Sequence, residues 1–219
     1  RRTRANHYRV EKFYREGKLR PMEVRGFSIL SDKSFSHGAY SISTIEMSDA
    51  MPVMHWRNEQ LDALRQKHPL TEESQSEYFE NVVKREFPKT QPNFILLRFT
   101  YQKKLIGYGG LVHINWHDKR AEVSFLLETT RAKNIGQYLM ELKIFLGLIK
   151  SVAFIEFELN KITTESYSHR PHHVEAIEEC GFNRDGILRD HTLIDGKWAD
   201  AILGSCLRSE YLDSLEDYK

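Results

Sequence analysis

The sequence predicts an α/β (α+β) domain with a mixed, mostly antiparallel central sheet and one parallel βαβ crossover. The first observation is a set of three apolar segments separated by short polar turns, at residues 94–101, 105–116 and 120–127. Turns this short join antiparallel strands. The second observation is a long apolar helical segment that precedes another strand, at 162–167, and such connections join parallel strands. The third is Asp195-Gly196 between two strand-like segments, a strong hairpin signal.

The N-terminal part divides into an extension and the start of the domain. Residues 6–19 have helical composition with alternating charge, and serines and a glycine follow them. We therefore expect an N-terminal helical extension over residues 1–38 and one domain over 39–219. Residues 40–47 alternate between apolar and polar side chains and predict the first strand.

Two helices are expected between the first strand and the three-stranded part. Ser48 or Asp49 is placed to cap the first helix. Thr71 opens the second helix, and the acids directly after it suit the positive end of the helix dipole. Pro171 similarly begins the last expected helix, and Gly181 follows its end.

Two features of the apolar segments indicate close packing. Gly107, Gly109 and Gly110 lie within one strand, which usually marks a bulge or a close approach of two backbones. The helix expected at 134–154 is apolar on most sides, so it should be buried against the sheet.

Composition excludes several classes of function. The 219 residues hold 32 Lys and Arg against 31 Asp and Glu, and this balance argues against nucleic acid or an anionic membrane as a partner. No uncharged apolar run approaches the ~18 residues that a membrane span needs. Cys180 and Cys206 are far apart and suggest neither a disulfide framework nor a metal site, so we expect a cytoplasmic protein.

The segment 122–136, EVSFLLETTRAKNIG, combines a strand, a polar loop and a helix start. The first amides of a helix lack internal partners, and the helix dipole adds positive potential there. The loop is therefore expected to bind the pyrophosphate of a nucleotide-type cofactor, helped by Arg131 and Lys133. The alternative is a plain strand-to-helix turn with solvated cations.

Three parts of the chain, taken in this order, resemble one known family. The first is the glycine-containing strand LIGYGG at 105–110 with RAEVSFLL at 120–127. The second is the loop RAKNIG at 131–136, and the third is AIEECGFNRDGILR at 176–189 with DGKWAD at 195–200. Over residues 39–210 the chain resembles the GNAT superfamily of acyl-CoA-dependent N-acyltransferases, and the third part is similar to its ribosomal-protein N-terminal acetyltransferase branch.

The sequence departs from the family pattern at three places. Asn134 replaces the first loop glycine, and asparagine is expected to keep the turn because it tolerates positive φ. Arg170 and His173 replace the family's Asn/Ser pair, and Ile177 stands where many members have a tyrosine that protonates the leaving thiolate.

The resemblance implies a GNAT fold and the transfer of an acetyl group from acetyl-CoA to a primary amine. It implies that the backbone near Leu126 and Leu127 polarises the thioester carbonyl. The cofactor-binding residues implied are Phe125, Leu126, Leu127, Arg131, Ala132, Lys133, Asn134, Ile135, Gly136, Arg170 and His173.

Three residues are the catalytic candidates. Glu122 is the one acid in an apolar strand, and burial would raise the pKa of its carboxyl toward a value suited to a general base. The alternative is an edge carboxylate paired with Arg120 or Lys119. Glu165 is the competing base, and Tyr167 is a candidate general acid.

The acceptor is left open by the sequence. Trp56-Arg57-Asn58 has a short likeness to acetyltransferases that act on nucleotide-linked amino sugars, and these residues are the acceptor-binding candidates. The alternative role for Trp56 is packing in the core. The alternative acceptor is a protein N-terminus or a small amine. The alternative to an enzyme is a non-catalytic module that binds acyl-CoA. We expect a monomer or homodimer. The histidine-rich segment 168–173 lacks the partners of a metal site.

Overall fold

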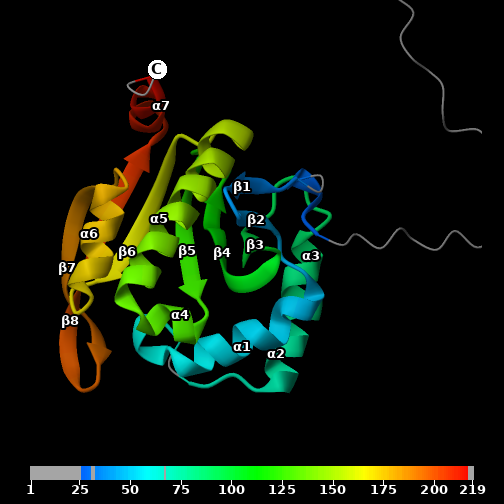
Figure 1. Cartoon of the computed structure of the whole chain (residues 1–219). Helices are drawn as coiled ribbons and strands as arrows, with labels where there is room; N and C mark the ends of the chain where they lie inside the picture. The colour runs from blue at the N-terminus through cyan, green and yellow to red at the C-terminus, as the bar shows by residue number, and fades with distance from the viewer. Residues whose placement is uncertain (1–25, 31–32, 67, 217–219) are drawn as a thin grey trace, which may run out of the picture.

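The computed structural model describes residues 26–30, 33–66 and 68–216, which form one mixed sheet with helices packed against it (Figure 1). The expected helix over residues 6–19 lies outside the described residues. Within the described ranges, no helix is both long and apolar enough to cross a bilayer.

The sheet has eight strands in the order β1-β2-β3-β4-β5-β6-β8-β7. All neighbouring pairs are antiparallel except β5 and β6, which are parallel. This topology confirms the predicted mixed sheet with one parallel crossover. The strands are β1 Phe35–His37, β2 Tyr40–Thr44, β3 Ile95–Tyr101, β4 Lys104–Asn115, β5 Arg120–Leu127, β6 Lys161–Tyr167, β7 Asn183–Ile194 and β8 Lys197–Leu207.

Two helices begin at the signals that the sequence provides, whereas Asp49 precedes α1 without a side-chain cap hydrogen bond. The Thr71 side chain accepts a hydrogen bond from the Ser74 amide, and Pro171 occupies the first turn of its helix. The α-helices are α1 Ala50–Glu59, α2 Glu72–Tyr78, α3 Lys84–Glu86, α4 Thr129–Lys133, α5 Ile135–Ser151, α6 Pro171–Glu179 and α7 Arg208–Glu216. Single 3₁₀ turns at Ser28–Leu30, Met47–Asp49 and Leu61–Ala63, and π turns at Phe79–Val83 and Val152–Glu156, complete the set.

The structure adds elements to both ends of the expected domain. Phe27 and Leu30 are buried in the core, and β1 pairs with β2, so residues 26–30 and 33–38 pack as part of the domain rather than as an extension outside it. Helix α7 follows β8, although no helix was expected there. The hairpin turn at Asp195-Gly196 forms as predicted, with positive φ at both residues.

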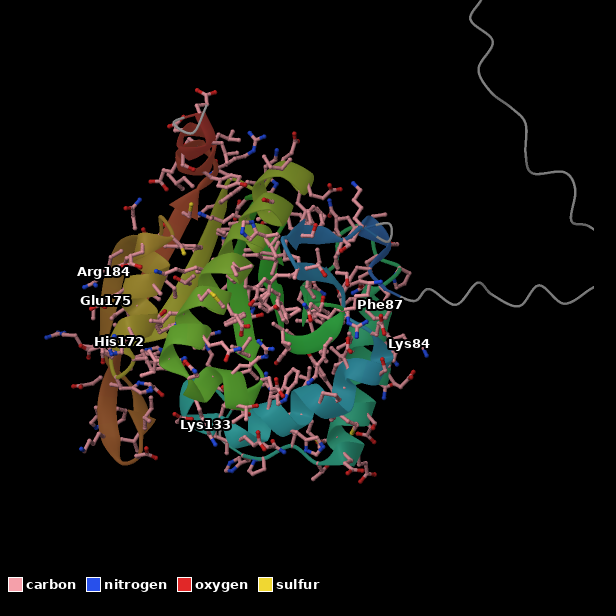
Figure 2. All side chains as sticks on the ribbon, in the orientation of Figure 1. Lys84, Phe87, Lys133, His172, Glu175 and Arg184 are labelled. Carbon is pink, nitrogen blue, oxygen red and sulfur yellow. The ribbon has the colours of Figure 1, made fainter. Side chains whose placement is uncertain are left out.

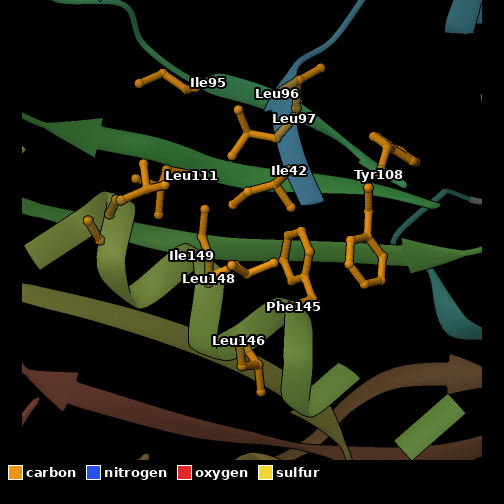
Figure 3. Close-up of a cluster of buried hydrophobic side chains, with 14 of the residues drawn as sticks. Ile42, Ile95, Leu96, Leu97, Tyr108, Leu111, Phe145, Leu146, Leu148 and Ile149 are labelled. Atoms are coloured by element: carbon orange, nitrogen blue, oxygen red, sulfur yellow. The ribbon is translucent and has the colours of Figure 1, made fainter. Parts of the chain in front are cut away.

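Helix α5 provides the centre of the core. Phe145 and Ile149 of α5 point toward the strands that carry Ile42 and Leu111 (Figure 3). Gly109 of β4 makes this contact possible, because a Cβ there would lie 2.7 Å from the Phe145 ring and 2.2 Å from the Ser124 carbonyl oxygen. The close approach predicted from the strand glycines is confirmed.

Candidate active site

The parallel strands β5 and β6 separate halfway along their length. Their pairing runs from Arg120↔Lys161 to Glu122↔Thr163 and ends there. Beyond that point β5 continues to pair with β4, and β6 continues to pair with β8 as far as Tyr167. A cavity of about 260 Å³ opens in the gap.

The cavity is lined from both faces of the sheet. Side chains alternate along a strand, so Glu122 and Ser124 lie on one face and Val123 and Phe125 on the other. All four line the cavity. The Phe125 ring packs 4.7 Å from the Phe145 ring of α5, measured between centroids, while Glu122 meets a side chain from the segment that follows α1. Two ligands can therefore meet here from opposite faces.

On the α1 face, Glu122 and Glu165 converge on one guanidinium. Arg65 Nη2 lies 2.9 Å from Glu122 Oε1 and 2.9 Å from Glu165 Oε2, and Arg65 Nε donates to Glu165 Oε1 at 3.1 Å. Burial lowers the pKa of Arg65, but the hydrogen bond to Glu165 and the charges of both acids outweigh it and raise that pKa overall. The predicted base and its rival therefore occupy one site and share one counter-ion.

Two further predictions concern this face. Glu122 does not pair with Arg120, whose guanidinium lies 3.6 Å from Asp118 instead. Tyr167 is buried and lines the same cavity. Burial, followed by the neighbouring Glu165 carboxylate, raises the pKa of the Tyr167 hydroxyl, so Tyr167 is protonated at neutral pH and is able to donate a proton.

On the α5 face, three polar side chains join α5 to the start of α6. Arg170 Nη2 donates to the Tyr138 hydroxyl at 2.8 Å, and that hydroxyl lies 2.7 Å from His173 Nδ1. Burial, and then the charge of Arg170, lower the pKa of His173 to about 3, so the imidazole is neutral. Because the Tyr138 hydroxyl already accepts from Arg170, its own hydrogen is available to Nδ1, and this arrangement assigns the imidazole proton to Nε2. Arg170 and His173 both line the cavity, as the cofactor prediction requires.

The loop after β5 differs in shape from the expected irregular loop. Residues Thr129–Lys133 form the short helix α4, and Asn134 has φ −88°, so its predicted positive φ was wrong. Asn134 instead caps α5, with its Oδ1 accepting from the Gln137 amide at 3.1 Å. A Cβ on Gly136 would meet only Asn134 Oδ1, at 3.7 Å, so the side of the helix start is sterically open.

The residues around this loop fit an acyl-CoA pyrophosphate in part. A helix leaves its first amides without internal acceptors, which gives Ile135 and Gly136 as donors toward an anion. Arg131 is already engaged, since it pairs with Glu128 at 3.3 Å and with the buried Glu141. Lys133 is exposed at the end of α4 (Figure 2) and is the loop cation that faces solvent. The fit therefore rests on two amides and Lys133.

The other cofactor candidates are placed by the sheet. Leu126 and Leu127 are buried and pair with Tyr108 and Gly107 of β4. The Leu127 carbonyl oxygen accepts a hydrogen bond from Gln60 at 2.9 Å. Ala132 lies within α4, where its amide bonds the Glu128 carbonyl oxygen. Their roles in binding a thioester remain predictions.

The three acceptor candidates on α1 occupy different surroundings. Arg57 lines the cavity and donates to the Tyr108 hydroxyl at 2.7 Å and to Gln66 at 2.8 Å. Asn58 is committed to its own segment, where its side chain bonds both the amide and the carbonyl of Leu70. Trp56 packs against the core and lines a separate cavity beside α4. Arg57 is thus the member of the three that lines the cavity between the strands.

Metal ligands do not gather around the histidine-rich segment. Among the described residues, no group of three or more His, Cys, Asp or Glu side chains is arranged to hold a metal ion.

The fold and the cavity define a class of protein. A sheet of this strand order, with a cavity between its separated parallel strands and a helix start beside it, is typical of an N-acyltransferase fold. The chain belongs to the GNAT acetyltransferase family, because the profile of the acetyltransferase (GNAT) domain matches residues 42–203. Enzymes of this family use acetyl-CoA.

Individual relatives agree with this assignment. The spermidine N(1)-acetyltransferase of Vibrio cholerae is 28% identical over 116 residues, which is 52% of this chain and 64% of the relative. The chain thus matches just under two thirds of that relative's length.

Solved structures show the same fold. The Vibrio cholerae spermidine N-acetyltransferase in complex with CoA and spermine has a TM-score of 0.69 at 20% identity, over 80% of this chain and 99% of that one. A dodecameric structure of the enzyme has a TM-score of 0.67 at 19% identity, over 81% and 99%.

Sequence reasoning missed Arg65 and Tyr138 as parts of the site. Arg65 lies outside any periodic segment, and its partners are 57 and 100 positions away in sequence. Tyr138 was predicted as one of the apolar residues of its helix. An acid on each of two neighbouring strands, Glu122 and Glu165, was the available signal for a missing cation.

Proposed function

We propose that this protein transfers an acetyl group from acetyl-CoA to a primary amine of a small cationic molecule of the polyamine type. The observation that supports this most is the convergence of Glu122 and Glu165 on one cation where β5 and β6 separate. A pair of carboxylates at this position attracts an ammonium group and holds it next to the gap between the strands.

The cofactor would approach from the α5 face. The amides of Ile135 and Gly136, with Lys133, would bind its pyrophosphate. Its pantetheine arm would pass between β5 and β6, beside the neutral His173 and the apolar side chains of α5. Neutral walls suit this arm, because it carries no charge.

The reaction needs one net proton acceptor. The amine arrives as an ammonium ion, and Glu122, directly or through a water molecule, takes one proton from it. The free amine attacks the thioester carbonyl carbon, and the C–S bond breaks as the C–N bond forms. The second amine proton goes to the thiolate, with Tyr167 positioned as its donor. The products are an N-acetyl amine, CoA thiol and the proton released from Glu122.

The acceptor class follows from charge. The two relatives described above act on spermidine, or hold spermine in the crystal, according to their names. A polyamine offers several ammonium groups, and the two carboxylates supply a matching site for one. A nucleotide-linked amino sugar gains no support from these acids or relatives, so we do not propose it as the substrate.

A thiol-release assay tests the proposal. Wild-type protein is mixed with acetyl-CoA and, separately, with spermidine, spermine, an amino sugar and a peptide with a free N-terminus. We expect thiol release with the polyamines and an acetylated product in the mass spectrum. Binding of acetyl-CoA by calorimetry without acetylation of any amine would contradict the proposal and favour a non-catalytic acyl-CoA-binding module.

A further inference from the structure

Arg65 belongs to a segment that is neither helix nor strand. It lies between the turn Leu61–Ala63 and the cap of α2 at Thr71. The segment is tied to α1 by side chains: Asn58 bonds Leu70 through its amide and carbonyl, and Arg57 Nε donates to Gln66 at 2.8 Å. Arg65 is thus held beside the cavity by a segment that side-chain hydrogen bonds join to α1, and residues 64–66 and 68–70 of this segment pair with no strand.

The guanidinium fills the space between two carboxylates. Arg65 uses Nη2 for both Glu122 and Glu165 and uses Nε for Glu165 as well. The side chains of Glu122 and Glu165 are only 23% and 16% exposed, while that of Arg65 is 49% exposed. The acids are therefore fixed parts of the sheet, and the cation between them is the part nearest to solvent.

The position between the two carboxylates favours a cation. Two carboxylates this close repel each other, so one cation between them is strongly favoured. A primary ammonium offers the same positive charge and three N–H donors. The place that Arg65 occupies is the place that an incoming amine requires if Glu122 is to take its proton.

We propose that Arg65 is a specificity-determining residue that acts as an internal competitor of the acceptor. Its guanidinium occupies the site of the acceptor ammonium, and the amine binds by displacing it. This inference rests on the proposed function and adds how the acceptor is selected: an amine must out-compete a tethered cation, so molecules with several ammonium groups are favoured over monoamines.

An opposite role for Arg65 fits the geometry less well. If Arg65 bound a carboxylate or phosphate of the acceptor, its charge would need to be available. Two carboxylates already neutralise it, and two of its nitrogens already donate to them. An acidic acceptor would be repelled by this site, because two carboxylates and one guanidinium leave its local charge negative.

The test compares Arg65→Gln with Arg65→Lys and with Arg120→Gln. Arg120 is on β5, like Glu122, but its guanidinium faces Asp118 and does not line the cavity. Only molecules with a free site bind the amine, so the apparent affinity equals the intrinsic affinity multiplied by the free fraction. If Arg65 fills the site in about nine molecules of ten, KM is raised about tenfold. We expect Arg65→Gln to lower KM for spermidine about tenfold with kcat within about twofold of wild type. Arg120→Gln should leave both constants unchanged.

A lysine tests the shape of the competitor. Arg65→Lys keeps the charge but not the planar fork that reaches both acids, so KM should fall by less than in Arg65→Gln. An unchanged or raised KM for spermidine in active Arg65→Gln protein would overturn the proposal, while acetylation by wild-type protein would leave the proposed function standing.

A binding experiment separates this inference from the activity. Propylguanidine carries the Arg65 head group on a free molecule. Calorimetry should show it binding Arg65→Gln protein at least about tenfold more tightly than wild type, because only the variant has the site free. Equal binding to both proteins would overturn the proposal even if no amine were ever acetylated. Thermal unfolding curves of both variants confirm that folded proteins are compared.

Discussion

The two faces of the central cavity differ in the charge of the side chains that line them. On the α1 face, Glu122 and Glu165 surround the Arg65 guanidinium with ion pairs of 2.9 Å. On the α5 face, Tyr138 and His173 form a half-buried, uncharged pair, and Arg170 is the cation beside it. This difference supports our proposal that one face binds the acceptor cation and takes its proton, while the other binds the neutral pantetheine arm of the cofactor.

The largest expected effect on activity is that of Glu122→Gln. The amide keeps the shape but cannot take the amine proton, and general-base groups contribute about 10²–10⁴-fold to rate. We expect kcat to fall by at least about 10²-fold, with acetyl-CoA affinity in calorimetry nearly unchanged. Glu165→Gln is the matched control and should lose less. If kcat falls more in Glu165→Gln than in Glu122→Gln, Glu165 is the general base. Unchanged turnover in Glu122→Gln would show that Glu122 is not the base.

Arg131 is expected to support the fold rather than the cofactor. It pairs with Glu141, whose side chain is fully buried, and Arg131→Met would leave that acid with Tyr40 and Gln137 alone. Breaking a buried pair costs about 3–5 kcal/mol, so the free energy of unfolding in denaturant should fall by about 3 kcal/mol. The double variant Arg131→Met, Glu141→Leu should recover most of this loss. If Arg131→Met instead had normal stability and reduced affinity for acetyl-CoA, Arg131 would be a ligand of the pyrophosphate.

The neutral face predicts a pH effect through His173. Its pKa is lowered to about 3 in the folded protein, against about 6.5 in the unfolded chain, so the unfolded chain binds more protons between these values. Stability should therefore fall as pH drops below about 6.5, by up to about 1.4 kcal/mol per pH unit from this group.

Denaturant titrations at several pH values measure this effect. The acid-side slope should be shallower in His173→Gln than in wild type. The exposed His172 on the same helix (Figure 2) provides the control, and His172→Gln should keep the wild-type slope. Equal slopes in wild type and His173→Gln would show that the α5 face is open to water.

The smallest expected effect is at Lys133. Its ammonium is exposed, so its contact with a phosphate is screened by solvent and salt. Lys133→Ala should weaken acetyl-CoA binding by about 1 kcal/mol, roughly fivefold, without changing stability. The loss should shrink at high salt. An affinity that does not change at low salt would leave the two helix amides as the sole pyrophosphate donors.

Sequence reasoning succeeded where one local rule decided the outcome. Strand alternation and turn chemistry predicted the topology, and glycine spacing predicted the close approach at Gly109. It failed where two rules competed. Asn134 is compatible with a left-handed turn and with a helix cap, and the free Gln137 amide at the start of α5 decided for the cap.

Contacts between distant segments were beyond sequence reasoning. Arg65 belongs to a segment without periodicity, so its pairing with two strands depends on how α1 is placed on the sheet. Similarly, the Arg131 side chain was assigned to a ligand because no sequence pattern indicates that it pairs with the buried Glu141 of α5.

A crystal structure with acetyl-CoA tests the account most directly. The account predicts the pantetheine arm between β5 and β6, beyond the Glu122↔Thr163 pair, with the thioester carbonyl reachable from the Glu122 side and the pyrophosphate at the start of α5. A cofactor whose pantetheine arm lies outside the gap between β5 and β6 would contradict it.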